Sequence, residues 1–307
     1  TDADDDGQTK PKPRVLFKER WKSKEARLRA ASPVGHMAGW RLVPVIVKAG
    51  DDLRQEQFCA QLIAQISRIL RAAELPVWLR PYEIVATGLD SGLIEAVPDT
   101  VSLDALRRND SEYTTLRDFF ARHFGAKTTP RRHMRAQLNF VQSLAPACIL
   151  CYLLQVKDRH NGNILLDAEG HIIHIDFGFI LASSPGGNLA FESAPFKLTP
   201  EFVELMGGPS SMLFRKFREL CVRTFMALRR ERHKLTLLVE MLVAGSDYLP
   251  CFAGRPHEAV EALRRRFHPE ISDGAAVDKV HELIDKATNN WRTAWYDEYQ
   301  RCCVGIY

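Results

Sequence analysis

A short hairpin pattern set between two polar clusters is the feature that most constrains the fold of this chain. Residues 164–166 (ILL) and 171–175 (HIIHI) are short isoleucine- and leucine-rich runs, and the Asp-Ala-Glu-Gly segment at 167–170 between them is typical of a turn. Residues 157–163 have the sequence KDRHNGN, and Asp176-Phe177-Gly178 directly follows the second run. A tight hairpin would bring both polar clusters to one edge of a small sheet.

The two sides of this hairpin predict different kinds of structure. Upstream, β-branched and apolar runs predict short strands at 41–48, 84–86 and 93–97. Apolar residues recur at helical spacing from 53 to 69, after Asp51 and Asp52, which predicts one long helix. Downstream of Pro98 helical patterns occupy 114–124, 131–156, 199–206, 211–231, 234–244, 256–267 and 276–303. The sequence therefore predicts an α+β fold with a small β-rich part and a larger helical part.

Composition and cysteine usage narrow the class of protein. The 307 residues are 46% hydrophobic and 26% charged, enough for a sizeable core. Cys148 and Cys151 lie in an apolar helix-like run without nearby histidines, so we expect core residues rather than a zinc or redox site. Seven scattered cysteines favour a reducing, intracellular compartment. Residues 1–15, rich in Asp, Lys and Pro, predict a disordered linker of a longer protein.

Membrane contact, if present, is expected to be peripheral. The apolar residues 144–154 include Pro146 and fall short of the roughly 20 residues that cross a bilayer. Basic clusters at 18–29, 122–135, 229–234 and 264–266 are most often solvated helix faces, although together they suit an anionic surface. Aromatic residues are not interleaved with these clusters, so we do not expect nucleic-acid binding.

The polar clusters around the hairpin predict phosphoryl transfer from ATP. This chemistry needs an acceptor for the proton of the attacking hydroxyl and oxygen ligands for Mg²⁺. An Asp-x-x-x-x-Asn loop at 158–163 followed by Asp-Phe-Gly at 176–178 supplies both, and the combination is far more specific than either motif alone. Lys48 at a strand end, with Glu56 eight residues later on the next helix, fits the lysine that contacts the phosphates.

These residues resemble the phosphatidylinositol 3-/4-kinase superfamily from about Trp21 to the C-terminus. The likeness rests on KAGDDLRQE at 48–56, the loop at 158–163 and HIDFG at 174–178. Three details, SPVGH at 32–36, QVK at 155–157 and SSP at 183–185, resemble the type III beta phosphatidylinositol 4-kinases, most of all the plant and algal members. The resemblance implies a two-lobed protein-kinase-like fold, with an N-lobe at 16–97 and a C-lobe at 98–307.

The resemblance also implies roles for residues around ATP. Lys48 would contact the phosphates and pair with Glu56, and residues 32–36 would lie over the phosphates. Residues 95–97 would form the hinge, with the backbone of Glu95 and Val97 bonded to adenine. The side chains expected to line the base pocket are Tyr82, Ile94 and Ile175, although for Tyr82 and Ile94 ordinary strand core is the alternative.

In the catalytic loop, we expect Asp158 to orient the inositol hydroxyl and accept its proton. His160 would assist at the γ-phosphate, with its protonated form offsetting negative charge. Asn163 and Asp176 would ligate Mg²⁺, with Mn²⁺ as a possible substitute, and Arg159 would brace the loop.

The segment at 179–197 would face the lipid headgroup. It contains one lysine and no arginine, which indicates phosphatidylinositol without ring phosphates as the substrate. Its apolar residues Ile180, Leu181, Leu189 and Phe191 would dip into the membrane interface or pack against the lobe. The aromatic C-terminal region around Trp291 and Trp295 would lie on the bilayer or dock on the kinase.

Phosphorylation at the 4-hydroxyl rests on the resemblance alone. A phosphatidylinositol 3-kinase and a related Ser/Thr protein kinase remain alternatives, while a pseudokinase or a pure binding module is disfavoured because Lys48, Asp158, Asn163 and Asp176 are all present. The resemblance further implies Golgi or trans-Golgi membranes, and recruiting proteins that act through upstream regions.

Overall fold

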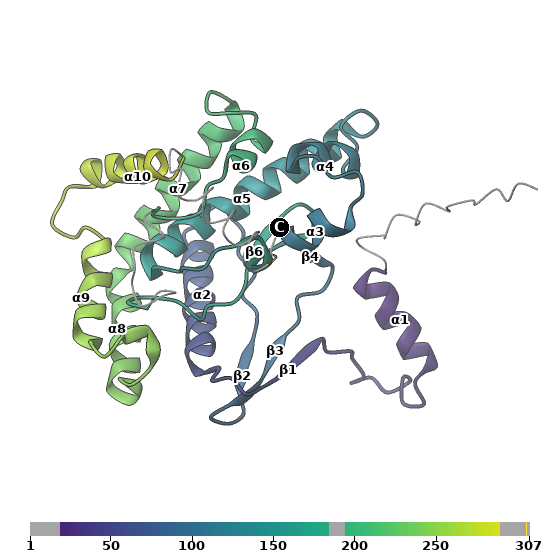
Figure 1. Cartoon of the computed structure of the whole chain (residues 1–307), viewed down its shortest axis with the longest axis horizontal. Coiled ribbons are helices and arrows are strands. Elements are labelled where there is room, and N and C mark those ends of the chain that lie inside the picture. Colours follow the sequence, from purple (N-terminus) through teal and green to yellow (C-terminus); the bar gives the residue numbers. More distant parts are fainter. Residues whose placement is uncertain (1–18, 184–193, 289–304, 306–307) are drawn as a thin grey trace, which may run out of the picture.

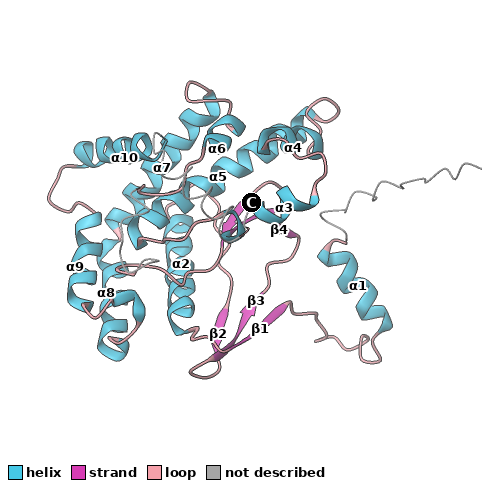
Figure 2. Cartoon of the chain, in the orientation of Figure 1, coloured by secondary structure: helices cyan, strands magenta, loops and turns pink. Residues whose placement is uncertain are grey.

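The structure, a computed structural model, describes residues 19–183, 194–288 and 305, and it is an α+β fold (Figure 2). The helices are α1 (Trp21–Ala31), α2 (Arg54–Ala72), α3 (Leu103–Asn109), α4 (Leu116–His123), α5 (Pro130–Leu154), α6 (Pro200–Leu205), α7 (Met212–Arg230), α8 (Arg232–Ser246), α9 (Pro256–Arg266) and α10 (Asp273–Thr288). The strands are β1 (Val45–Ala49), β2 (Ile84–Ala86), β3 (Ser91–Glu95), β4 (Thr100–Ser102), β5 (Ile164–Asp167) and β6 (Ile172–His174). Two 3-10 turns complete the set, η1 (Asn161–Asn163) and η2 (Pro250–Phe252).

The first sheet is antiparallel, with the strand order β1-β3-β2, and it holds the strand end that carries Lys48. Lys48 lies opposite Gly92 in the β1–β3 register. A side chain at Gly92 would meet Leu53 Cδ1 and Val85 O, each 2.6 Å from an ideal Cβ position. The missing side chain therefore lets the strands and the start of α2 approach one another closely.

The second sheet contains the predicted hairpin. β5 and β6 pair antiparallel from Ile164↔His174 to Leu166↔Ile172. Asp167 accepts hydrogen bonds from the backbone amides of Glu169 and His171 at 2.9 and 2.8 Å, which is the local bonding that makes aspartate a turn former. Strand β4 pairs with the free side of β5 and was not predicted from the sequence.

Helix α5 is the core of the helical part. It is long and apolar enough to span a membrane by length and composition, but 83% of its apolar window is buried inside the protein. It packs most extensively on α7, and it also contacts β6, α4 and α9. In its first half Phe140 packs against phenylalanines of α4 and α6. Phe119, Phe120, Phe140 and Phe202 are almost completely buried, and their rings meet edge to face.

Helix α2 joins the small sheet to the helical part, as Figure 1 shows. It contacts β2 on one side and helices α7 and α8 on the other. Its apolar face is the one predicted from the spacing of residues 53 to 69, and Leu53, Leu62 and Ile66 are essentially inaccessible to solvent. The exposed helix α1 lies apart from this body, and its first amide, Trp21 N, donates to Asp99 Oδ1 at 2.8 Å.

The predicted α+β class and the main helices are confirmed, with differences at the edges. Residues 41–44 are not part of strand β1, because pairing with β3 starts at Val45. Helices α1 and α3 were not predicted. The predicted last helix is described only to Thr288, and the expected linker at 1–15 and the aromatic region around Trp291 lie outside the described residues.

Candidate active site

The catalytic loop is held by bonds among its own residues. Asp158 has a left-handed backbone, with φ of 61°, and its carbonyl accepts from Asn163 Nδ2 at 3.0 Å. The amide of Gly162 donates to His160 Nδ1 at 3.1 Å, so a neutral His160 carries its proton on Nε2. That Nε2 lies 3.9 Å from Asp158 Oδ2. The loop thus brings Asp158, His160 and Asn163 together, as predicted.

His160 differs from the prediction in its charge. Burial lowers its pKa, and Arg159 and Lys197 lower it further, while Asp158 acts in the opposite direction. The imidazole is therefore mainly neutral at pH 7 and offers an N–H donor rather than a full positive charge.

The strip from Ile175 to Gly178 is clamped through its backbone. Arg159 donates to the carbonyls of Ile175, at 2.6 Å, and of Asp176. Gln55, from the first turn of α2, donates to the carbonyls of Phe177 and Gly178 at 3.3 and 2.6 Å. Four successive carbonyls are thus held by one side chain from the catalytic loop and one from α2. This confirms that Arg159 braces the loop.

Asn163 and Asp176 flank the open end of the hairpin. Ile175 N donates to Asn163 O at 3.1 Å, so the backbone of Asn163 bonds the residue directly before Asp176. Asn163 uses its side-chain nitrogen to bond Asp158 O, which leaves its side-chain oxygen available to a cation. The exposed Asp176 has a left-handed backbone, with φ of 61°.

This donor set fits Mg²⁺. Magnesium usually takes one or two protein oxygens and completes its octahedron with phosphates and water. No group of three or more His, Cys, Asp or Glu that could hold a metal exists within residues 19–183 and 194–288. A site of one amide and one carboxylate oxygen therefore suits a metal that arrives with nucleotide.

Lys48 lies between two carboxylates. Its Nζ is 3.6 Å from Glu56 Oε1, as predicted, and 2.6 Å from Asp51 Oδ2, a partner not predicted. Burial lowers the pKa of Lys48, but the bond to Asp51 and the attraction of Glu56, Asp51 and Asp176 outweigh burial and raise it. For Glu56 burial dominates and raises the pKa, although Lys48 acts in the opposite direction. The Lys48 ammonium is thus held by Asp51 and Glu56.

The hinge backbone suits adenine. The Glu95 amide donates to Glu83 O at 2.8 Å, so its carbonyl is the group that could accept an adenine amino hydrogen. The Val97 N–H has no hydrogen-bond partner in the part of the chain that the structure describes, which leaves it as a donor. The Glu95 carboxylate pairs with Arg80 and accepts from Glu83 N at 3.0 Å, which fixes the end of β3.

The predicted base-pocket residues divide into two groups. Ile94 and Ile175 are partly exposed and pack against the core, which suits a pocket wall. Tyr82 is 6% exposed, accepts from Asp176 N through its hydroxyl at 3.2 Å, and stacks on Phe177 with ring centroids 6.2 Å apart. Its observed contacts support the position of Asp176.

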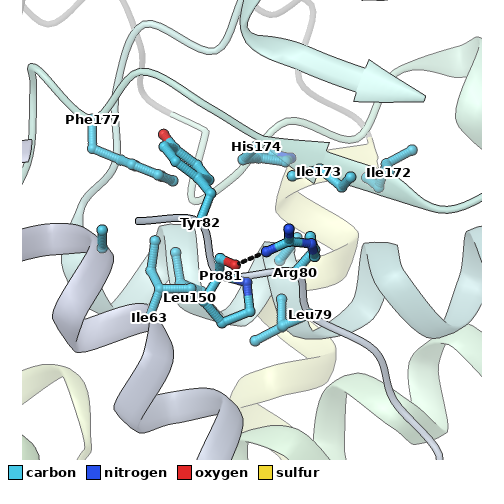
Figure 3. A pocket seen from close by; sticks show the side chains of 12 residues that line it. Ile63, Leu79, Arg80, Pro81, Tyr82, Leu150, Ile172, Ile173, His174 and Phe177 are labelled. Carbon is cyan, nitrogen blue, oxygen red and sulfur yellow. Dashed lines mark hydrogen bonds between the residues drawn. The ribbon is translucent and has the colours of Figure 1, made fainter. Parts of the chain in front are cut away.

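A small cavity lies behind this strip (Figure 3). Its volume is about 30 Å³, and Tyr82, Phe177, His174 and Leu150 are among the residues that line it. This is room for one or two water molecules and not for a nucleotide.

The loop at 32–36 keeps its hydrogen bonds local. Gly35 O accepts from Arg29 Nε at 2.8 Å, and an added Cβ at Gly35 would lie 1.9 Å from Arg29 O. Its contact with the phosphates stays a prediction.

Three polar side chains at the site were missed by sequence reasoning: Asp51, Gln55 and Lys197. Asp51 and Gln55 lie inside the KAGDDLRQE segment, so the motif itself was the available signal. Lys197 is buried, and its Nζ donates to Asn161 Oδ1 at 3.0 Å. The sequence offers less indication of a role for Lys197, which differs from its surroundings only in being the one basic residue of 179–197.

Comparison with known proteins decides the family. Residues 42–253, more than half of the chain, match the family model described as phosphatidylinositol 3- and 4-kinase. The chain belongs to the phosphatidylinositol 3- and 4-kinase family. The match includes the predicted site residues from Lys48 to Asp176, whereas the loop at 32–36 lies outside it.

Individual relatives are similar over 95% of the chain. Phosphatidylinositol 4-kinase beta 1 of Arabidopsis thaliana is 47% identical over 296 residues, phosphatidylinositol 4-kinase of Dictyostelium discoideum 45% over 291, and phosphatidylinositol 4-kinase beta of Mus musculus 44% over 292. The chain spans 26%, 24% and 35% of these relatives. The predicted likeness to the beta type of phosphatidylinositol 4-kinase is confirmed.

Proposed function

We propose that this protein transfers the γ-phosphate of ATP to the 4-hydroxyl of phosphatidylinositol, giving phosphatidylinositol 4-phosphate. The observation that carries the proposal is the assembly at the hairpin edge. Asn163 bonds Asp158 O there, and its own carbonyl accepts from the residue before Asp176. The charge of Asp176 also acts on Lys48, which pairs with Glu56. The 4-position is supported by the names of the relatives.

The proposed roles follow the geometry. Asp158 orients the attacking hydroxyl and accepts its proton, and His160 donates an N–H to the transferred group. Lys48 contacts the phosphates. Asn163 and Asp176 would hold Mg²⁺, or Mn²⁺ in its place, and the metal would neutralise charge on the phosphates. Glu95 and Val97 bind the adenine edge through their backbone, with Ile94 and Ile175 against the base.

The charge of the headgroup segment supports an unphosphorylated inositol ring. Recognition of ring phosphates would need several Lys or Arg side chains. Residues 179–197 contain Lys197 alone, and its ammonium is turned into the protein toward Asn161. No basic side chain of this segment is left to meet a phosphorylated ring.

We further propose that the protein acts as a peripheral enzyme on intracellular membranes, with the Golgi and trans-Golgi as its site. Recruiting proteins would act through regions outside this chain, since the relatives are about three to four times as long. The support for this location is likeness to the beta-type relatives.

The test is to incubate the protein with Mg-ATP labelled at the γ-phosphate and vesicles of phosphatidylinositol, and to separate the labelled headgroup isomers. We expect label in the 4-phosphate, lost in Asp176→Ala because a proposed metal ligand is removed. Label in the 3-phosphate would contradict the ring position, and label on an added protein with none on lipid would contradict lipid as the substrate.

A further inference from the structure

Lys197 is a buried lysine without an assigned role. Its exposed fraction is 7%, and its neighbours Phe196 and Leu198 are buried as well. A lysine is rarely buried, because removing an ammonium from water is costly unless polar partners compensate for it. The hydrogen bond from Nζ to Asn161 Oδ1, at 3.0 Å, is one such contact. An alternative side chain of similar length, such as Met, would avoid the cost, so the charge itself calls for an explanation.

The partner of Lys197 sits at the centre of the catalytic loop. Asn161 begins the turn η1, is 6% exposed, and lies between His160 and Asn163. The positive charge of Lys197 also reaches two histidines of the site. It acts with burial and Arg159 to lower the pKa of His160 and of His174, the latter to about 3. A fixed cation therefore stands next to the loop that would meet the transferred phosphate.

The headgroup segment is fastened to the catalytic machinery at both ends. At its start, Gly178 O accepts from Gln55, and Phe179 O accepts from Lys157 N at 3.0 Å. At its end, Lys197 bonds Asn161. The described residues at both ends of this segment are therefore bonded to the loop that would activate the lipid hydroxyl or to the residue directly before it.

We propose that Lys197 is a positioning residue that ties the end of the headgroup segment to Asn161 and thereby holds the catalytic loop in its reactive geometry. This inference rests on the proposed function. Lys197 acts through Asn161, so its loss slows the transfer step and leaves nucleotide binding, which uses Lys48 and the hinge, nearly unchanged. Loss of loop geometry of this kind costs about 10- to 100-fold in rate.

The experiment compares Lys197→Met, Lys197→Arg, Asn161→Ser and the Lys197→Met/Asn161→Ser double variant with the unmodified protein. kcat and KM for ATP are measured with phosphatidylinositol vesicles, and ATP hydrolysis is measured without lipid. Lys216→Met is the matched control, since Lys216 is a surface lysine bonded to Glu219 on α7. Thermal melting identifies any variant that does not fold, and Asn161→Ser then tests the same contact from the other side.

We expect kcat of Lys197→Met to fall by about 10- to 100-fold with KM for ATP changed by less than about threefold, and Lys197→Arg to recover part of the loss. The kcat of the double variant should be no lower than that of the less active single variant, because both substitutions remove the same contact between Lys197 and Asn161. Three results would overturn the proposal. The first is a double variant whose loss of kcat is the product of the two single losses. The others are a Lys197→Met protein whose KM for ATP rises by the same factor as kcat falls, and one whose kcat is unchanged. If the unmodified protein makes no lipid product, the proposed function fails, and ATP hydrolysis by the same variants still decides the role of Lys197.

Discussion

At the scale of single residues, the Lys48 and Glu56 pair is unequal in burial. The side chain of Lys48 is 37% exposed and that of Glu56 only 9%. Burial raises the pKa of Glu56 despite the nearby lysine. A carboxyl whose pKa is higher in the folded than in the unfolded state stabilises the fold most below its unfolded pKa, and this contribution is lost as pH rises through the folded pKa. Near pH 7, the buried Glu56 carboxylate therefore lowers the free energy of unfolding relative to its value at acidic pH.

Replacing Glu56 by Gln should separate stability from activity. Relative to the unmodified protein, the free energy of unfolding of Glu56→Gln should increase as pH rises from about 4.5 toward 7, because the amide has no proton to lose. Phosphoryl transfer should fall about tenfold or more, because Lys48 loses a charged partner. Urea unfolding at several pH values measures the first effect and lipid phosphorylation the second.

Glu258→Gln is the control, since Glu258 is an exposed carboxylate of α9. The prediction would be contradicted if the free energy of unfolding of Glu56→Gln, compared with that of the unmodified protein, decreased over the same pH range.

At the scale of elements, Gly92 sets the distance between the sheet and α2. It lies opposite Lys48 on β3, and the space for its side chain is filled by Leu53, at the start of α2, and by Val85 O of β2. One methyl group here would push β2 and α2 away from β3. Since Lys48 is on β1 and Glu56 on α2, this shift would act directly on the ion pair.

Gly92→Ala should therefore destabilise the fold by about 1–3 kcal/mol, the usual cost of forcing an extra methyl into a packed site. It should also raise KM for ATP, because Lys48 is displaced. Thermal unfolding and steady-state kinetics check the two effects. The control is Gly39→Ala, since an added Cβ at Gly39 meets no atom within 4 Å. Equal stability and kinetics for both variants would show that the sheet has room at Gly92.

At the scale of the whole molecule, the helical part is fastened by contacts far from the site. Arg229, at the end of α7, donates to the carbonyls of Phe267, His268 and Ile271 at 3.1, 2.9 and 2.5 Å, and it pairs with Asp273 at the start of α10. One buried side chain thus holds the connection from α9 to α10 against α7.

Arg229→Met should lower the free energy of unfolding by about 3 kcal/mol, because several carbonyls and Asp273 lose their donor. KM for ATP and kcat per folded molecule should stay unchanged, since none of these groups belongs to the site. The neighbouring Arg230→Met is the control, because Arg230 is exposed on the same helix. Loss of kcat at a temperature where Arg229→Met is fully folded would show that this region acts on the site after all.

The sequence by itself determined what depends on neighbours along the chain. The hairpin at 164–175 follows from two short apolar runs and a turn, and a hairpin there is enough to bring Asp158, Asn163 and Asp176 to one edge of the sheet. The long helix α2 follows from its apolar period, which put Glu56 within reach of Lys48. The family, the hairpin and the position of the proposed catalytic loop and metal ligands were therefore accessible from local pattern and motif.

Only the tertiary structure decided features that depend on residues far apart in sequence. Strand β4 has only three residues, too few for a recognisable strand pattern in the sequence. It forms because it can pair with the free edge of β5, which lies more than 60 residues further along the chain. The sequence predicted Tyr82 for the base pocket, and only the fold shows that its hydroxyl accepts from the amide of Asp176. Gln55 and Lys197 look like surface polar residues in the sequence, and they are buried because Gly178 and Asn161 are brought to them by the fold. A side chain's burial and partner depend on the packed surroundings, and local sequence does not contain them.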